Sequence, residues 1–458
     1  MSPGPSADYP RRIWGLETEY GITCASRTGG APPMDADDAA RLLFQPVVRM
    51  GRSSNVFLGN GGRLYLDVGS HPEYATAECD RLSDLLAQDR AGAVMLARLA
   101  GEANEWLDQE GVEGRIHLFR NNLDTSGNSF GCHENYLVRR RPDYKQFVQS
   151  LVPYLVTRQV LVGAGHLRSV GGRLTLDFSQ RAGQMWDSLS SATTRSRPMV
   201  NTRDEPHADV DLYRRMHVIV GDSNMSESAT LLKVAATDLL VSLVESGHRF
   251  RLELVDPMSA IREVSADRTG QVPLELTDGR RMTPIALQRH YLDAVVEAYG
   301  EGPTPWHAAA IDLWRRGLEA VEGGDHTAVA TELDWAIKQR LVERYQARAG
   351  ATLAGLRRLL LAYHDITGPT LLERLEGEGL VRRLTSPDAV RRAVDSPPTS
   401  TRAALRGAFV AAAQERRRDY SVDWVHLKLA DPAQRTVMLY DPFATRDERV
   451  DALIAAVG

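Results

Sequence analysis

The stretch GGRLYLD alternates polar and apolar side chains, which is typical of a β-strand with two unlike faces. Arg63, Tyr65 and Asp67 share one face, and Leu64 and Leu66 share the other. Such a strand buries its leucines and turns a guanidinium, a phenol and a carboxylate toward an open surface. The pattern therefore predicts a sheet with one face built for chemistry.

The segment from residue 12 to 23 shows a similar alternation and is predicted to form another strand. Glu17 and Glu19 point the same way on it, about 7 Å apart. At an effective dielectric constant of about 20, their repulsion is on the order of 2 kcal/mol. A divalent cation or a shared proton removes this cost, and Mg²⁺ prefers oxygen ligands.

If these strands lie side by side, one sheet face carries several carboxylates, a phenol and a guanidinium. Glu73, in the loop predicted after the RLYLD strand, then completes the set, with His133 beyond it. Each residue alone has a simpler interpretation: a solvated pair of glutamates, a packing role for Tyr65, a satisfied core histidine for His217. The combination favours a site for a metal ion and a nucleotide.

Three other motifs bear on this interpretation. No GxxxxGK[ST] motif occurs, so a phosphate-binding P-loop is absent. GNSFG fits the GxSxG pattern of hydrolase nucleophiles, but that pattern requires a helix after the turn, and a strand is predicted here. Arg195, Arg197 and Arg203 form either a solvated loop or a clamp on phosphates or a carboxylate.

A chain of 458 residues is long enough for two or three domains. Apolar residues have helical spacing in four regions: residues 35–50, 80–110, 226–246 and 284–380. The consecutive prolines of DSPPTST stop a helix and mark the best candidate linker. We therefore predict a large domain of residues 1–396 and a small domain of residues 397–458 docked on it. The small domain is expected to contain a helix, the strands VDWVHLKL and TVMLYDPF, and a second helix.

Composition excludes several classes of protein and kinds of site. Hydrophobic residues make up 43% of the chain, and no run approaches the roughly 18 apolar residues of a membrane span. The N-terminal stretch lacks the apolar segment of a secretion signal, so a cytoplasmic protein is expected. Cys24, Cys79 and Cys132 form no CxxC pair, which argues against disulfides and structural zinc. A net charge of -5 gives no positive field for nucleic acid, so local arginines must hold any anionic ligand.

Long motifs are spread over the chain: GLETEYGIT, GRSSNVFLGNGGRLYLDVGSHPEYATAECD, NNLDTSGNSFGCHENY, SSATTRSRP, NTRDEPHAD, HVIVGDSNMSE and VDWVHLKL. These motifs resemble those of the Pup ligases, the proteasome accessory factor A family, from residue 11 to the C-terminus. The resemblance implies an α+β fold like that of glutamine synthetase, with helices behind a curved, mostly antiparallel sheet. It also implies a small C-terminal α/β domain.

The resemblance further implies an activity. Pup ligases use ATP and Mg²⁺ to activate the C-terminal glutamate side chain of Pup, a small disordered protein modifier, as a glutamyl phosphate. A lysine of a substrate protein then attacks, giving an isopeptide bond, ADP and phosphate, and the tagged protein is marked for the proteasome. The implied partners are Pup and lysine-bearing substrate proteins, and the implied state is a monomer without membrane or nucleic-acid contacts.

The family motifs also imply residue roles. Asp67 matches the catalytic base. The positions that match metal ligands, or fall close to them, are Glu17, Tyr65, Glu73, Glu19 and His133. The positions that match contacts to ATP, or that hold phosphates or the Pup carboxylate, are Arg63, Thr76, Trp424, Arg203, His217 and Arg181.

The closest alternative is the related Pup deamidase and depupylase, which shares the fold and the ATP site. Its members resemble GTEVEYGI and YVDHAHPEYS more than the present GLETEYGIT and YLDVGSHPEYAT. They also carry a long insertion between the first strand and the catalytic strand, whereas this interval is short here. A glutamate-cysteine ligase or a non-catalytic Pup-binding scaffold are further alternatives, and the intact acidic set argues against the scaffold.

Overall fold

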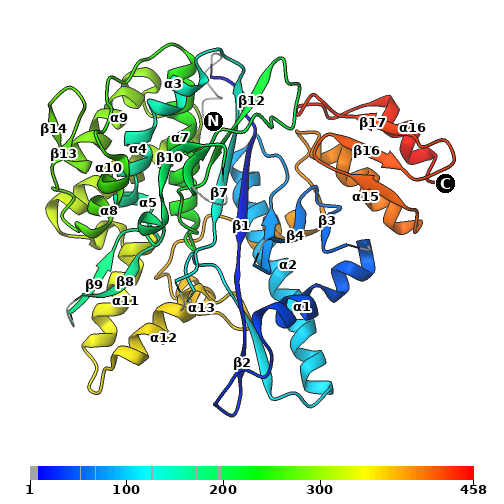
Figure 1. Cartoon of the computed structure of the whole chain (residues 1–458), viewed down its shortest axis with the longest axis horizontal. Coiled ribbons are helices and arrows are strands. Elements are labelled where there is room, and N and C mark those ends of the chain that lie inside the picture. Colours follow the sequence, from blue (N-terminus) through cyan, green and yellow to red (C-terminus); the bar gives the residue numbers. More distant parts are fainter. Residues whose placement is uncertain (1–8, 52, 68, 125–126, 171–172, 193–196) are drawn as a thin grey trace.

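The computed structural model describes residues 9–51, 53–67, 69–124, 127–170, 173–192 and 197–458. An eight-stranded sheet forms its centre, in the order β10-β11-β12-β7-β1-β5-β4-β3 (Figure 1). Its strands are β1 (Trp14–Glu19), β3 (Asn55–Phe57), β4 (Arg63–Asp67), β5 (His71–Ala75), β7 (Cys132–Arg139), β10 (Asp187–Ser190), β11 (Pro198–Asn201) and β12 (Tyr213–Val218). All neighbours are antiparallel except β10 and β11. The predicted α+β class with a mostly antiparallel sheet is confirmed.

Smaller sheets flank this one. They pair β2 (Gly21–Ser26) with β6 (Gly114–Phe119), β8 (His166–Val170) with β9 (Arg173–Asp177), β13 (Leu274–Glu275) with β14 (Arg281–Met282), and join β15 (Tyr420–Val422), β16 (His426–Leu429) and β17 (Thr436–Met438).

Helices make up most of the remaining structure. They are α1 (Ala36–Gly51), α2 (Leu82–Gln109), α3 (Tyr144–Gln149), α4 (Val152–Thr157), α5 (Gln159–Val162), α7 (Glu227–Glu245), α8 (Pro257–Ala266), α9 (Pro284–Tyr299), α10 (Pro305–Gly323), α11 (Asp334–Gln346), α12 (Leu353–His364), α13 (Leu371–Gly377), α14 (Pro387–Asp395), α15 (Ala403–Glu415) and α16 (Glu448–Ala455). The helices predicted over residues 35–50, 80–110 and 226–246 and the helical region 284–380 are confirmed. Within the described parts of the chain, no helix is both long and apolar enough to cross a membrane.

The helices cover one face of the central sheet. The long helix α2 packs behind β1 and β5, and α7 packs behind β7. Trp14 and Leu16 of β1 and Tyr136 and Val138 of β7 are buried there in the main hydrophobic core. The odd-numbered residues of β1, which include Glu17 and Glu19, therefore lie on the opposite face, as the alternation predicts.

The single strand predicted over residues 12–23 is wrong in one respect, because the chain bends at Tyr20. Residues before the bend form β1 in the central sheet, and residues after it form β2, which pairs with β6. Gly21 permits the bend, since a Cβ there would lie 2.9 Å from the ring of Phe130. The Tyr20 N–H donates to the Pro72 carbonyl at 2.8 Å, which anchors the bend to β5.

The loop predicted after the RLYLD strand is also wrong, because its residues form β5. Gly69 and Ser70 turn the chain with φ of 89° and 60°, both in the left-handed region. The resulting hairpin inserts β5 between β1 and β4, so the two predicted strands are not neighbours. The polar side chains of β1 and β4 still lie on one face of the same sheet.

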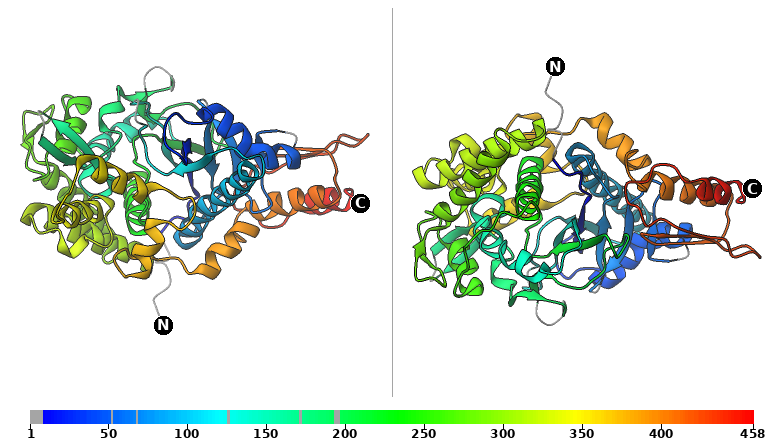
Figure 2. Two further views of the ribbon diagram at one scale, coloured as in Figure 1. Left: turned by 90° about the horizontal axis from the view of Figure 1, so that it is seen from below. Right: turned by 90° about the horizontal axis from the view of Figure 1, so that it is seen from above.

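The C-terminal unit packs α15 and α16 with the sheet of β15 to β17 around its own hydrophobic cluster. It lies at one end of the molecule, coloured orange to red in Figure 2. The predicted strand VDWVHLKL is split, since Val422 ends β15 and His426 begins β16. Trp424 therefore lies in the hairpin turn. The separate cluster supports the domain boundary between residues 396 and 397, which stays a prediction.

Candidate active site

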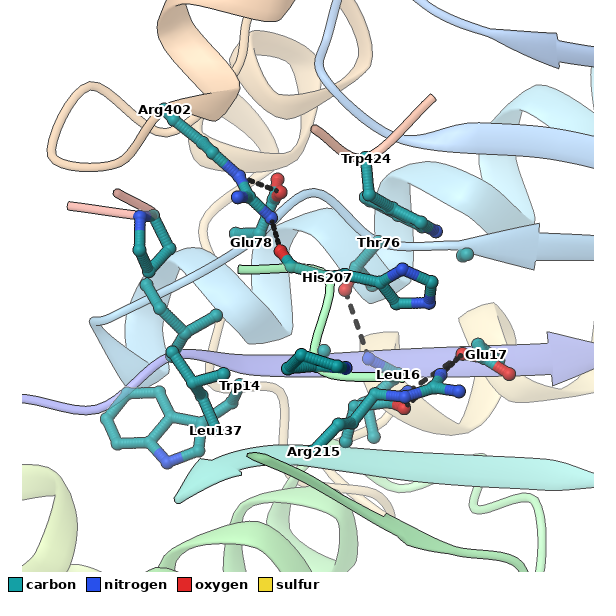
Figure 3. Close-up of a pocket in the computed structure, with 16 residues that line it drawn as sticks. Trp14, Leu16, Glu17, Thr76, Glu78, Leu137, His207, Arg215, Arg402 and Trp424 are labelled. Atoms are coloured by element: carbon teal, nitrogen blue, oxygen red, sulfur yellow. Dashed lines mark hydrogen bonds and ion pairs between the residues drawn. The ribbon is translucent and has the colours of Figure 1, made fainter. Parts of the chain in front are cut away.

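A cleft lies on the face of the sheet that the helices leave uncovered. Its larger part, here called the acidic chamber, has a volume of about 830 Å³ and is lined by residues of β1, β4, β5, β7 and β12 and by the turn at Trp424. A smaller part of about 70 Å³, here called the apolar chamber, adjoins it (Figure 3). Both parts share five lining residues: Glu17, Ala75, His207, Arg215 and Trp424.

Strand register aligns the acidic side chains. Glu73 on β5 lies directly opposite Glu19 on β1 and opposite Tyr65 on β4. Glu17 lies opposite His133 on β7. Cross-strand neighbours of this kind have Cβ atoms about 4.5–5.5 Å apart. Residues from four different strands are therefore brought to one small area.

The first group of possible metal ligands consists of Glu19, Asp67 and Glu73. One oxygen atom from each carboxylate lies within 4.8 Å of the others. The Tyr65 hydroxyl donates a hydrogen bond to Glu73. Burial, together with the charges of Glu19 and Glu17, raises the pKa of Glu73 well above its usual value. A bound cation would offset this repulsion, so the donor set fits a hard divalent ion.

The second group consists of Glu17, His133 and His217, whose ligand atoms also lie within 4.8 Å of one another. The Glu17 carboxylate lies 3.3 Å from His133 Nδ1 and 3.6 Å from His217 Nε2. Asn135 Nδ2 donates to it at 2.9 Å, and an Arg215 nitrogen lies 3.5 Å away.

The members of the second group differ in their protonation: His217 is neutral and Glu17 is ionised. Burial, reinforced by the positive charge of Arg215, lowers the pKa of His217 to about 3, so its ring is neutral at pH 7. Burial would raise the pKa of Glu17, but the contacts to His217, His133 and Arg215 hold it well below its usual value. With His217 neutral, the contacts to His133 and Arg215 keep Glu17 ionised. An ionised carboxylate beside a neutral imidazole is a competent ligand pair.

Aromatic and basic side chains form one wall of the cleft. The Arg63 guanidinium lies 4.4 Å from the centre of the Tyr65 ring and donates to Asn55 Oδ1 at 2.8 Å. The Trp424 ring meets the Phe57 ring edge to face, with centroids 5.0 Å apart. This wall offers a cation and a flat apolar surface near the junction of the two chambers.

The apolar chamber is a slot behind this wall, lined by residues that include Gly15, Leu137 and Pro206 (Figure 3). Thr76 lies on its floor, buried, and its hydroxyl oxygen accepts from the Leu16 N–H at 3.1 Å. The hydroxyl proton is not used in that contact. A planar heterocycle with a polar edge suits such a slot.

Several arginines line the acidic chamber. Arg181 is buried and donates to the Phe130 carbonyl at 2.6 Å, and its Nε has no hydrogen-bond partner among the described residues. Burial lowers the pKa of Arg181, although Glu19 opposes the effect. Arg203 lies exposed at the rim and donates to the Ser191 carbonyl at 3.0 Å. Arg197 also lines the chamber, and Arg195 lies outside the described residues.

The structure brings the predicted site residues together in this cleft. The acidic chamber is lined by Glu17, Glu19, Arg63, Tyr65, Asp67, Glu73, His133, Arg181, Arg203, His217 and Trp424. Thr76 lines the apolar chamber instead. Two residues of the site were not predicted from the sequence. Asn135 lies two residues after His133, and Arg215 lies two residues before His217. Period-two alternation along β7 and β12 would have found them.

Comparisons with known proteins agree with this geometry. The family model described as Pup-ligase protein matches residues 12–428. The Pup–protein ligase of Xylanimonas cellulosilytica is 54% identical, over 98% of this chain and 100% of that protein. That of Sanguibacter keddieii is 55% identical, over 98% and 99%.

Two solved structures are also similar. The complex between prokaryotic ubiquitin-like protein Pup and its ligase PafA gives a TM-score of 0.91 at 42% identity, covering 98% of this chain and 92% of that chain. PafA in complex with ADP gives a TM-score of 0.84 at 43% identity, covering 93% and 94%. A family model over most of the chain and relatives above half identity leave one conclusion: this chain belongs to the Pup ligase family.

Proposed function

We propose that this chain is an ATP- and Mg²⁺-dependent Pup–protein ligase. It joins the side-chain carboxylate of the C-terminal glutamate of Pup to substrate lysines through a glutamyl phosphate. The observation that carries the proposal is the row of Glu19, Glu73 and Tyr65 across β1, β5 and β4, beside a slot for a planar base. The curated relatives at 54% and 55% identity are named ligases, which favours ligation over the deamidase alternative.

The nucleotide is proposed to span both chambers. The base enters the apolar chamber near Thr76, with Trp424 at its edge, and the phosphates extend into the acidic chamber beside Arg63. PafA was solved with ADP, which supports nucleotide use by the family. A slot dominated by apolar side chains and a chamber dominated by charged ones match the two ends of ATP.

Glu17, Tyr65 and Glu73 are the proposed Mg²⁺ ligands, with Glu19 beside Glu73 in the first ligand group and His133 beside Glu17 in the second as further candidates. Bound there, Mg²⁺ would offset the charge on the phosphates and on the buried carboxylates. Burial and the charges of Glu17 and Glu73 raise the pKa of Tyr65 far above its usual value. Its phenol therefore contacts the site as a neutral oxygen.

The reaction has two steps. A carboxylate oxygen of the Pup glutamate attacks the γ-phosphorus of ATP, and the bond to ADP breaks. The lysine nitrogen then attacks the acyl carbon of the glutamyl phosphate, and phosphate leaves. Arg181, Arg203 and His217 are proposed to hold the phosphates or the Pup carboxylate while the groups meet.

Asp67 is the proposed base. A lysine ammonium, with a pKa of about 10.4 in water, must lose a proton before it can attack. Asp67 ends β4 on the chamber face, and one of its oxygens lies within 4.8 Å of ligand atoms of Glu19 and Glu73. It can accept the proton next to the activated carboxylate.

The proposed partners are Pup and lysine-bearing substrate proteins, and the complex of Pup with PafA supports the first of these. As a disordered chain, Pup is expected to fold on binding. The proposed setting is the cytoplasm, because ATP is available there and Cys24, Cys79 and Cys132 are all unpaired.

The test is a gel-shift assay with purified protein, ATP, Mg²⁺, a lysine-bearing substrate and Pup ending in glutamate. A heavier lysine-linked product that requires both ATP and Mg²⁺ is expected. A substrate with dimethylated lysines serves as the matched control and should give no product. Absence of product, together with ammonia release from Pup ending in glutamine, would instead establish the deamidase.

A further inference from the structure

A buried ion-pair node joins the C-terminal unit to the sheet behind the apolar chamber. Glu78 accepts hydrogen bonds from Arg402 Nε and Arg406 Nη1, each at 2.9 Å, and a further bond from Arg406 Nη2. Arg402 is 2% exposed and Arg406 is fully buried. Such a node is sensitive to the loss of one member, because the remaining charges stay buried.

The two arginines use their other N–H groups to hold separate chain segments. Arg402 donates to the carbonyl of Leu439 at 2.7 Å and to the carbonyl of His207 (Figure 3). Arg406 donates to the carbonyl of Gly61 at 2.9 Å and to that of Trp424 at 3.2 Å. One carboxylate thus indirectly fixes four backbone positions.

Two of the four segments held in this way line the apolar chamber. His207 and Trp424 line it, as do Glu78 and Arg402 themselves. The Arg406 guanidinium also lies 5.0 Å from the centre of the Trp424 ring. Glu78 does not line the acidic chamber, so among the described contacts the node acts on the apolar chamber, where the base of the nucleotide is proposed to bind.

Electrostatics makes the arginines dependent on Glu78. Burial would raise the pKa of Glu78, but Arg406 and Arg402 lower it to about 2, so it is fully ionised at neutral pH. Without that charge, two buried guanidiniums would face each other with no counter-charge, and each would have to move toward water. Either movement releases the carbonyls that shape the chamber wall.

We infer that Glu78 is a positioning residue for nucleotide binding: through Arg402 and Arg406 it fixes Trp424 and the backbone of His207 as a wall of the apolar chamber. The inference rests on the proposed function, in which the base of ATP occupies that chamber. Glu78 takes no part in phosphoryl transfer or in the attack by lysine. Its loss therefore weakens nucleotide binding while the reacting groups stay in place.

The test compares Glu78→Gln with the wild type, using the dissociation constant of a fluorescent ATP analogue and the dependence of conjugation on ATP concentration. The variant is expected to weaken binding and raise KM for ATP about ten-fold, with kcat changed by less than about two-fold. Glu78→Asp keeps the carboxylate and should recover part of the loss. A folded Glu78→Gln with wild-type affinity, or with kcat alone reduced, would overturn the inference.

Asp80→Asn is the matched control. Asp80 lies two residues further on and also ties distant segments together, because it accepts from Arg11 at 2.5 Å and from Ser400. It lines neither chamber, so this variant should bind the analogue like the wild type. An equal loss in Asp80→Asn would show general loosening of the C-terminal unit and refute a specific role for Glu78.

A measurement on the wild type covers the case in which Glu78→Gln does not fold. Addition of ATP should slow amide hydrogen exchange around Arg402, Arg406 and Trp424, and unchanged exchange there would contradict the inference. Failure of the proposed function gives a different result. In that case the wild type would bind the ATP analogue and Glu78→Gln would bind it more weakly, but the wild type would form no conjugate with Pup.

Discussion

Glu73 lies directly opposite Glu19 in the antiparallel pairing of β5 with β1, and both carboxylates line the acidic chamber. Tyr65 lies on the other side of Glu73 and donates its hydroxyl to it. Glu73 is 2% exposed and Glu19 is 8% exposed, so their repulsion is poorly screened by water. A bound cation would offset this repulsion, which is the role proposed for the row.

Glu73→Gln tests this role. The neutral side chain keeps the shape of the row but removes one charge, so conjugation should fall by about 100-fold or more. Mg²⁺ with ATP should raise the melting temperature of the wild type, and this rise should largely vanish in the variant. Glu113→Gln, an exposed glutamate remote from the cleft, serves as the control. A variant that is still stabilised like the wild type would exclude Glu73 as a ligand.

Asp67→Asn separates binding from chemistry. An amide cannot accept the lysine proton, so conjugation should be lost by at least about 100-fold while nucleotide affinity stays within about three-fold of the wild type. Product formation by gel shift and titration with a fluorescent ATP analogue measure the two quantities. Loss of nucleotide binding in Asp67→Asn would refute the assignment of the base.

Thr76→Val tests the floor of the apolar chamber. Valine has nearly the same shape but leaves the buried Leu16 N–H without its acceptor, which should lower the free energy of unfolding by about 1–3 kcal/mol. KM for ATP should rise as well, because the hydroxyl is lost from the proposed base site. Thr76→Ser retains the hydroxyl and should preserve both values. Equal behaviour of the two variants would show that the hydroxyl is unimportant.

The Glu78 node predicts a particular dependence of stability on pH. Its pKa is lowered from 4.5 to about 2 in the folded protein, so the ionised form binds its arginines more strongly than in the unfolded chain. The linked stabilisation, on the order of 3 kcal/mol, is fully present above about pH 5 and is lost as pH falls from 4.5 toward 2.

Urea unfolding of the wild type and Glu78→Gln at several pH values measures this effect. The difference in unfolding free energy should be constant from pH 5 to 7 and should shrink as the pH falls below about 4.5. A difference that is independent of pH down to pH 3 would contradict the lowered pKa.

Much of the active face could be predicted from local sequence. Alternation in GLETE and RLYLD correctly assigned Glu17, Glu19, Arg63, Tyr65 and Asp67 to one face, because a strand has a side-chain period of two. Strand order was not predictable in the same way. Nothing local shows that HPEYA is a strand, since Pro72 and the preceding glycine are typical of a loop.

Other parts of the site depend on contacts between distant segments. Trp424 reaches the cleft only because the C-terminal unit docks on the sheet, so its assignment came from family resemblance alone. Thr76 was assigned in the same way, and its place under the apolar chamber depends on β1. The roles of Arg402 and Arg406 were not predicted, because their partner Glu78 is more than 300 residues away in the sequence. Nothing in the local sequence shows that these arginines are buried and paired.

Diffraction from crystals grown with Mn²⁺, in place of Mg²⁺, and a non-hydrolysable ATP analogue tests the central claim most directly. Anomalous peaks should lie about 2.0–2.3 Å from carboxylate oxygens of Glu17 and Glu73, with the base of the analogue in the apolar chamber above Thr76. Nucleotide bound elsewhere, or Mn²⁺ absent from the face shared by β1, β5 and β4, would contradict the account.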